Sequence, residues 1–541
     1  MKFIQFLHSL LAYDHPTSFR ETIKSDRLFI TFILSSAIVL FVIASFVWNV
    51  ELGRDWHRYF IYFFKFPADP NLFTLPGTPI ILGIMAKGGF YTFYLFLFTG
   101  YLFSIFGVYY VARVFSQNMA RIAAIFALGH LQLTYFHVRL NSDPLFVFSC
   151  TLLAVSLVRL YKKRDILSYS IIGAVILLTA MVRPIGQLFA ILFLMPIVCY
   201  GFSKKNLILA GVIFSIVFGG FTGVAAYHYS ELGKFVVTEG SGGLIFRGAY
   251  LLSKVISPEN GPASQRLKKF VDELVKDPIY KDAGITTERF FNEPNKYFYY
   301  DIANAEPKSI ESVNDNLEMV QFLAEVSKEG MIANPIKYIS TVYTNIAFTF
   351  TRVIDPGELP FPDAKKAETK AVKKKCKYSP NCYFPTPTTV ASIRRGKNQE
   401  EAPIEQRQKQ ERLNNYLASI DEMFKSTPFT PSTDINSTGA FVRYYLGEFA
   451  RSLIYKYPSI LYCTFLSVLL LIGIKREEIR LTILLLIPSI AAPSISSFID
   501  PIPNYRLPHD LYIVIGTMVG ITLIVKLFLN IIGLHEIKRP I

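Results

Sequence analysis

FITFILSSAIVLFVIASFVW, residues Phe29–Trp48, is the stretch that decides the fold. It holds no charged residue over a length that matches the roughly 18 to 20 apolar residues needed to cross the hydrocarbon core of a bilayer. Across the 541 residues, 51% are hydrophobic, 15% are aromatic and only 18% are charged. These values predict a mainly helical, polytopic membrane protein and exclude a large soluble core.

Further apolar runs predict about ten spans, so the expected fold is a transmembrane helical bundle. Basic clusters such as Lys162-Lys163-Arg164 and Lys475-Arg476 fall on one side, which predicts a cytoplasmic N-terminus. This topology explains the formal charge of +15 without nucleic acid. We expect a multi-pass protein of a bacterial inner membrane, with the endoplasmic reticulum as the alternative. The spans lie near residues 29–48, 90–111, 121–138, 144–161, 166–182, 185–202, 206–228, 452–474, 480–495 and 510–533.

Three domains follow from this pattern. Residues 1–228 form an N-terminal transmembrane module with the first extracytoplasmic loop, and residues 450–541 form a C-terminal one. Between them, residues 229–449 are polar and long enough to bury a core of their own, so we expect an extracytoplasmic domain. Its stretch from 304 to 350 has helical periodicity, with a serine, Ser309 or Ser312, as the expected cap.

Residues 362–412 are rich in Lys, Glu, Gln, Pro and Thr, which predicts a loosely packed insertion. Its positive charge could instead gather an anionic acceptor or lipid headgroup. Cys376 and Cys382 could form a local disulfide, and the sequence leaves this open. Cys150 and Cys199 lie in apolar segments, where we expect core residues.

The first span leads directly into ELGRDWHRYFIYFFKFPADPNLFTLPGTPIILG, Glu51–Gly83. This loop sets Asp55 just beyond the predicted membrane boundary, where a carboxylate is costly unless it binds, reacts or is paired. Asp55 suits a general base that takes a proton from an attacking hydroxyl. A salt bridge with Arg54 or Arg58 is the structural alternative.

The predicted topology brings several unusual polar residues to the same extracytoplasmic side as Asp55. An enzyme that moves a group from an activated lipid needs a base near the interface and cations for the departing phosphate. The candidate substrate-binding residues are Lys65, Lys87, Asp143, Arg183, Tyr505, Arg506 and His509.

Several of these candidates also have a purely structural interpretation. Lys87 could anchor a span by extending its amine to the headgroups. Asp143 precedes Pro144, where it could cap a helix or complement its dipole. Arg183 could mark a break between two spans. No HExxH, paired CxxC or Walker-type motif is present, so zinc, iron-sulfur and nucleotide chemistry lack support.

Together these motifs resemble the GT-C superfamily of integral membrane glycosyltransferases, in particular the branch of protein O-mannosyltransferases and lipid A aminoarabinose transferases. Arg54-Asp55 with Tyr59 and the turn Pro76–Gly83 look like that branch's first extracytoplasmic loop, in which an aspartate is the catalytic base. Four further segments are similar to other motifs of the branch: Ser142–Phe146, Met181–Gly186, Ala333–Tyr338 and Asn504–Pro508.

The resemblance implies a polyprenyl-phosphate sugar as donor, a hydroxyl of a glycan, lipid or protein as acceptor, and inversion at the anomeric carbon. Asp55 would be the base, and Lys87, Arg183 and Arg506 would be phosphate ligands. Trp56 stands where protein mannosyltransferases have a glutamate, which argues against a protein acceptor. Some related enzymes use a divalent metal ion, but the sequence has no clear ligand cluster for one.

Two other functions remain open from the sequence. The same charges could line the passage of a transporter or flippase of lipid-linked sugars, although no internal repeat supports this. A noncatalytic scaffold that binds a partner through residues 229–449 is the third hypothesis.

Overall fold

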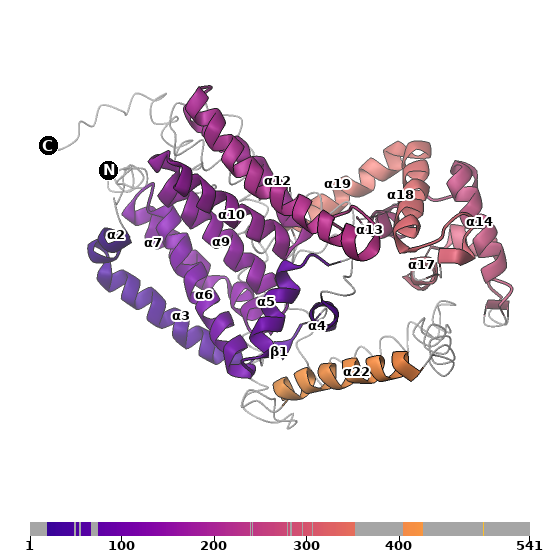
Figure 1. The fold of residues 1–541 in the computed structure, drawn as a ribbon, viewed down its shortest axis with the longest axis horizontal. Helices are drawn as coiled ribbons and strands as arrows, with labels where there is room; N and C mark the ends of the chain where they lie inside the picture. Colours follow the sequence, from indigo (N-terminus) through magenta and orange to yellow (C-terminus); the bar gives the residue numbers. More distant parts are fainter. Residues whose placement is uncertain are drawn as a thin grey trace.

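The computed structural model describes residues 19–47, 50–53, 56–66, 74–238, 240, 242–277, 280–281, 284–294, 296–303, 305, 307–351, 404–425, 491 and 515. Figure 1 shows a mainly helical architecture in which a bundle of long helices stands beside a smaller helical lobe. Predictions that lie outside these residues concern the last three spans, the Cys376–Cys382 pair, Asp55, and the loop with Tyr505, Arg506 and His509.

Four helices of the bundle are long and apolar enough to cross a membrane: α3, α6, α9 with its 3-10 extension η1, and α12. They correspond to four of the predicted spans. The predicted span at 166–182 is a shorter apolar helix, α10. The bundle elements are α2 (Phe19–Ser25), α3 (Arg27–Val47), α4 (Trp56–Lys65), α5 (Gly77–Ala86), α6 (Phe90–Ala112), α7 (Gln117–Gly129), α8 (Leu131–His137), α9 (Ser142–Leu160), η1 (Tyr161–Lys163), α10 (Ile166–Val182), η2 (Pro184–Leu194), α11 (Met195–Tyr200) and α12 (Lys204–Leu232).

Two predicted spans are broken helices. The span at 121–138 is divided between α7 and α8 because the backbone leaves the helical region at His130, whose Nδ1 caps α8 by accepting from Leu133 N. The span at 185–202 begins as the 3-10 helix η2 after Pro184 and continues as α11. Both breaks are local features that hydropathy alone does not reveal.

The inner helices are α6, α9 and α10. α6 packs against α3, α7 and α9, and α10 packs against α9, η2 and α12. Within its apolar window, 72% of α9 is buried but only 22% of α12, so α12 lies at the edge of the described bundle. Cys150 and Cys199 are buried, which confirms the prediction that they are core residues.

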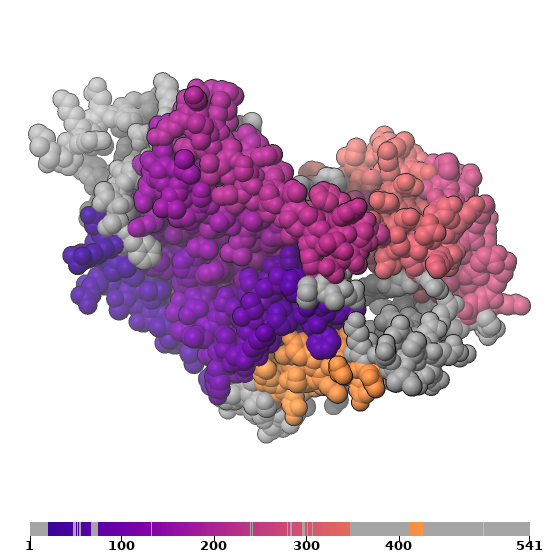
Figure 2. Space-filling model, viewed as in Figure 1, coloured from indigo at the N-terminus to yellow at the C-terminus, as the bar shows by residue number. Residues whose placement is uncertain are grey.

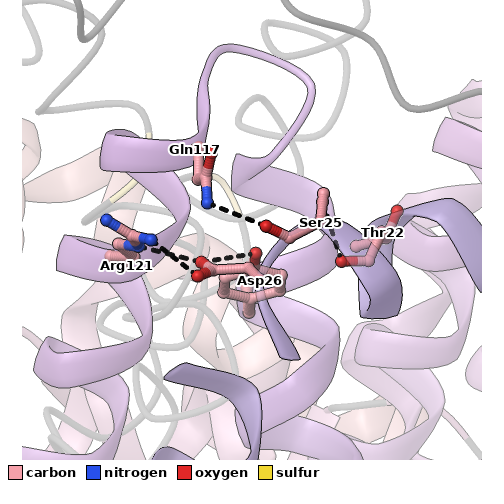
Figure 3. A network of polar contacts seen from close by, with 6 residues as sticks. Thr22, Ser25, Asp26, Gln117 and Arg121 are labelled. Carbon is pink, nitrogen blue, oxygen red and sulfur yellow. Dashed lines mark hydrogen bonds and ion pairs between the residues drawn. The ribbon is translucent and has the colours of Figure 1, made fainter. Parts of the chain in front are cut away.

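The N-terminal end of α3 is fixed to α7 by a polar cluster (Figure 3). Arg121 donates two hydrogen bonds to the carboxylate of Asp26, from Nε at 2.9 Å and from Nη2 at 2.6 Å. Tyr109 adds a third bond from its hydroxyl at 3.0 Å. Such a bidentate pair is stabilised by the attraction of opposite charges and by two parallel hydrogen bonds.

The lobe has its own hydrophobic core, which includes Phe246, Phe290 and Phe322. Asp315 caps α18 by accepting from Leu317 N and Glu318 N, so the expected cap at Ser309 or Ser312 is wrong. The lobe elements are α13 (Gly242–Arg247), η3 (Gly248–Leu252), η4 (Pro258–Asn260), α14 (Pro262–Leu274), α16 (Thr287–Asn292), α17 (Lys296–Ala303), η5 (Pro307–Ser309), α18 (Asn316–Ala333) and α19 (Pro335–Thr351).

A further long helix, α22 (Ile404–Lys425), crosses the predicted end of the insertion at residue 412. It packs against α4 and β1 and joins the core of the bundle, not that of the lobe. In Figures 1 and 2 it lies along the end of the bundle that carries α4 and β1. The C-terminal part of the expected insertion, residues 404–412, is therefore the start of a helix, and a later residue of that helix, Tyr416, contacts the first loop.

Candidate functional site

The site is built at one end of the bundle, where the loop after α3 meets the start of α9. Strand β1 (Glu51–Leu52) pairs in parallel with β2 (Arg139–Leu140), which ends directly before α9. The ladder continues through Gly53 N, which donates to Leu140 O at 2.9 Å. A Cβ on Gly53 would lie 2.7 Å from Cβ of Asn141, so only glycine allows this approach. We call the end of the bundle formed by β1, β2 and the start of α9 the loop end.

A side-chain bond joins α4 to the same place. The hydroxyl of Tyr59 donates to Oγ of Ser142 at 3.0 Å. Ser142 is the first residue of α9, and the N-cap is Asn141, whose Oδ1 accepts from Asp143 N at 2.7 Å. Asn141 therefore supplies the cap that the sequence suggested for Asp143. Asp143 lies in the first turn, where its charge complements the helix dipole.

Asp143 forms an ion pair with Arg183, the residue that follows α10. Both side chains are largely buried, at 11% and 17% exposure. The Arg183 guanidinium also lies over the ring of Phe146, with 5.7 Å between Cζ and the ring centroid. The first residues of α9 thus contact Arg183 through a carboxylate, that of Asp143, and an aromatic ring, that of Phe146. A guanidinium has five N–H donors, more than one carboxylate oxygen can accept.

The start of α5 fixes the end of α10. Thr78 Oγ1 donates to Val182 O at 2.8 Å, directly before Arg183. A Cβ on Gly77 would lie 2.6 Å from Met181 O, so the backbones of α5 and α10 approach closely here. The Pro-Gly-Thr turn predicted as a motif therefore contacts the Met181–Gly186 segment, another of the predicted motifs.

The two lysine candidates lie at helix ends. Lys65 is the last residue of α4, and Lys87 caps the C-terminus of α5. Lys87 Nζ lies 5.7 Å from the ring centroid of Phe63 on α4. This cation–π contact shows one use for the Lys87 charge, beside the phosphate role that the sequence suggested.

An aromatic cluster from α22 covers α4. The ring of Tyr416 stacks on Phe64 with centroids 5.3 Å apart and meets Phe60 edge-on at 6.3 Å. Phe424 packs against Phe90 and Phe93 at the start of α6, at 5.4 and 5.5 Å. These contacts, which the sequence analysis did not anticipate, connect residues more than 300 apart in sequence.

Tyr62 stands out on the side of α4 opposite Phe60 and Phe64. Its side chain is fully buried, and its ring stacks on Phe66 with centroids 6.2 Å apart. Its hydroxyl has no hydrogen-bond partner among the described residues. Burial and the nearby Tyr227 raise the pKa of Tyr62, so the hydroxyl stays protonated and able to donate.

The structure thus brings together Asp143 and Arg183 and connects them through Ser142 and Tyr59 to the loop that contains Asp55. Asp55 lies outside the described residues, between Gly53 and Trp56. Sequence reasoning missed Ser142, Tyr62 and Tyr416 as site residues. Tyr62 lies in an aromatic run and Tyr416 in a mainly polar stretch, and only their neighbours in space distinguish them. Among the described residues, no group of three or more His, Cys, Asp and Glu side chains could hold a metal ion.

Comparisons with family models, with curated proteins and with solved structures found no match to this chain.

Proposed function

We propose that the protein is a membrane glycosyltransferase that moves a sugar from a polyprenyl-phosphate donor to a hydroxyl of a glycan, lipid or protein. The proposal includes about ten spans, a location in a bacterial inner membrane and a loop end on the extracytoplasmic side. Asp55 is the general base. Lys65, Lys87, Arg183 and Arg506 are the cations for the phosphate, and Asp143, Tyr505 and His509 complete the substrate site.

The observation that carries the proposal is the attachment of the first loop to the Asp143–Arg183 pair. A displacement needs the base on one side of the anomeric carbon and a cation near the phosphate on the other. The bonds of Gly53 to Leu140 and of Tyr59 to Ser142 fix the loop against the helix end that grips Arg183. This supports a shared site for Asp55 and Arg183.

In the proposed step, the acceptor oxygen attacks the anomeric carbon as the bond from that carbon to the phosphate oxygen breaks. The acceptor proton passes to the Asp55 carboxylate. The electron pair of the broken bond stays on the phosphate oxygen, whose charge the Arg183 guanidinium stabilises by charge-assisted hydrogen bonds. One displacement inverts the configuration of the sugar.

Purified protein incubated with a panel of polyprenyl-phosphate sugars and membrane extract tests this function. A transferase releases polyprenyl phosphate and labels an acceptor in the extract. A transporter moves the donor between leaflets of a vesicle and releases none. Lipid-sugar movement without release, from protein that is folded, would replace the proposal with transport.

A further inference from the structure

The exposed faces of two successive helices, α18 and α19, differ sharply in chemistry. On α18 the exposed residues Gln321, Glu325 and Lys328 are polar. The helix ends at Ala333, and the backbone of Asn334 is not helical. On α19 the exposed residues Ile336, Ile339 and Tyr343 follow one another in steps of three and four, which keep side chains on one face of a helix. We call these three residues and exposed Ile332, which lies at the end of α18, the apolar row.

These four side chains are 65 to 84% exposed. Among the side chains of residues 233–346 whose exposure the structure describes, Phe235 is the only other exposed large hydrophobic one. Single exposed apolar residues are normal, but a short segment that contains nearly all of them marks an interaction surface. The side of α19 away from Ile336 faces the protein, since Tyr338 packs against the lobe core and Val342 is buried.

Two threonine hydroxyls on α19 are satisfied within the helix. Thr341 Oγ1 donates to Lys337 O at 2.9 Å, and Thr344 Oγ1 donates to Ser340 O at 2.9 Å. Hydroxyls that bond to the preceding turn do not need water or a protein partner. These two hydroxyls therefore do not prevent this face of the helix from entering an environment of low polarity.

Basic residues gather around the break between α18 and α19. Lys328 precedes Ile332, and Lys337 lies one residue after Ile336. Lys337 Nζ donates to Lys254 O at 2.7 Å, which brings exposed Lys254 to the same place. Lysines beside an apolar face are typical of helices that lie in the interface of an anionic bilayer.

The position of α19 also fits a membrane surface at the C-terminal end of α12, a helix long and apolar enough to cross a membrane. Exposed Tyr229 and Phe235 stand at its C-terminal end, and aromatic side chains favour the membrane–water interface. In Figure 1, α19 lies on the side of the lobe nearest α12 and crosses the direction of α12 instead of following it. A helix in the plane of the interface has that orientation relative to a span.

We propose that α19 is an interfacial helix, which docks the lobe on the bilayer by burying Ile336, Ile339 and Tyr343 among the lipids, together with Ile332 at the adjoining end of α18. The occupant of this face is a lipid surface with anionic headgroups. This inference does not depend on the proposed glycosyltransferase activity.

The test is a scan of nitroxide accessibility in full-length protein reconstituted in liposomes that contain an anionic phospholipid. The five native cysteines are replaced by alanine, and single cysteines are introduced at 336, 339 and 343 for labelling. Gln321→Cys and Glu325→Cys are matched controls on the exposed face of α18. We expect a high ratio of collisions with oxygen to collisions with a water-soluble nickel complex at the three test positions, and a low ratio at the controls.

Two results would overturn the proposal. A low oxygen-to-nickel ratio at 336, 339 and 343 would show that the face lies in water. Low collision rates with both reagents would show that protein covers it, either another segment of this chain or a second copy. If the cysteine-free protein does not fold, Tyr343→Trp in the native background gives the same information, through quenching by bromine on the lipid acyl chains. Quenching no stronger than that of the protein with only its own two tryptophans would also contradict the proposal.

Discussion

The hydroxyl of Tyr59 on α4 donates to Oγ of Ser142 on α9 at 3.0 Å, across 83 positions of sequence. Ser142 precedes Asp143, which holds Arg183. One hydrogen bond therefore connects the loop that contains the proposed base to the start of α9, where Asp143 pairs with Arg183, the proposed phosphate ligand.

Tyr59→Phe removes this bond and leaves the ring in place. We expect a loss of stability of about 1 kcal/mol. We expect the rate of sugar transfer to fall by about tenfold, because a small displacement of a reacting group is enough for such a loss. Thermal unfolding and the release of polyprenyl phosphate measure the two effects. Adding Ser142→Ala should cost little more, since the bond is already lost. Fully additive losses would mean that the two hydroxyls do not act together.

Arg183→Gln should reduce transfer by about 10²- to 10³-fold, the usual effect of removing one group that stabilises transition-state charge. It should also lower stability, because Asp143 is then a largely buried charge without its cation. The double variant with Asp143→Asn separates the two roles. Its stability should recover while transfer stays low. Recovery of transfer together with stability would show that Arg183 is only a structural partner of Asp143.

The sequence predicted features that depend on local patterns. Four of the predicted spans lie on long apolar helices, and Asp143 and Arg183 were predicted to share one side of the membrane. Their contact was not predictable, because it depends on how α9 and α10 pack. The β1–β2 pair and the contact between Tyr416 and Phe64 also join distant segments. No periodicity in one segment contains that information.

Some local features were also predicted wrongly. Ser309, Ser312 and Asp315 all precede α18, and both serine and aspartate are good caps. The sequence therefore could not choose among them. The sequence analysis did not predict the first residues of α22, because residues 362–412 have a composition typical of loose segments. Its apolar residues, such as Ile420 and Phe424, lie beyond that stretch.

Asp26→Asn should lower the free energy of unfolding by about 1 to 3 kcal/mol, because it breaks the charged bonds with Arg121. The value is moderate since the Arg121 side chain is 42% exposed. Gln117→Ala is the matched control in the same cluster, where the bond to Ser25 O is long at 3.4 Å. It should have almost no effect. Equal losses from the two variants would contradict the importance of the ion pair.

The same pair predicts a dependence on pH. Burial of Asp26 would raise its pKa, but the bonds with Arg121 and Tyr109 outweigh this and hold the pKa below its usual value of 3.8. The stabilisation is therefore present above about pH 4 and is lost as the pH falls through the lowered pKa of the folded state. The difference in melting temperature between wild type and Asp26→Asn should shrink in acid. A difference that grows in acid would contradict this sign.

Tyr62→Phe removes a buried hydroxyl that has no partner among the described residues. Stability should stay unchanged or rise by about 1 kcal/mol, because an unpaired polar group no longer has to be buried. Tyr101→Phe is the control, since the Tyr101 hydroxyl accepts from Thr134 Oγ1 at 2.9 Å and its loss should be destabilising. Thermal unfolding of both variants checks this. A clear loss of stability in Tyr62→Phe would show that this hydroxyl has a partner.

The central claim is that Asp55 acts as the base in sugar transfer from a polyprenyl-phosphate donor. The most direct test compares the release of polyprenyl phosphate by wild type and Asp55→Asn, with donor binding measured on the same samples. We predict that Asp55→Asn abolishes release but leaves folding and donor binding close to wild type, because the amide cannot accept the proton. Release by Asp55→Asn at the wild-type rate would contradict the account.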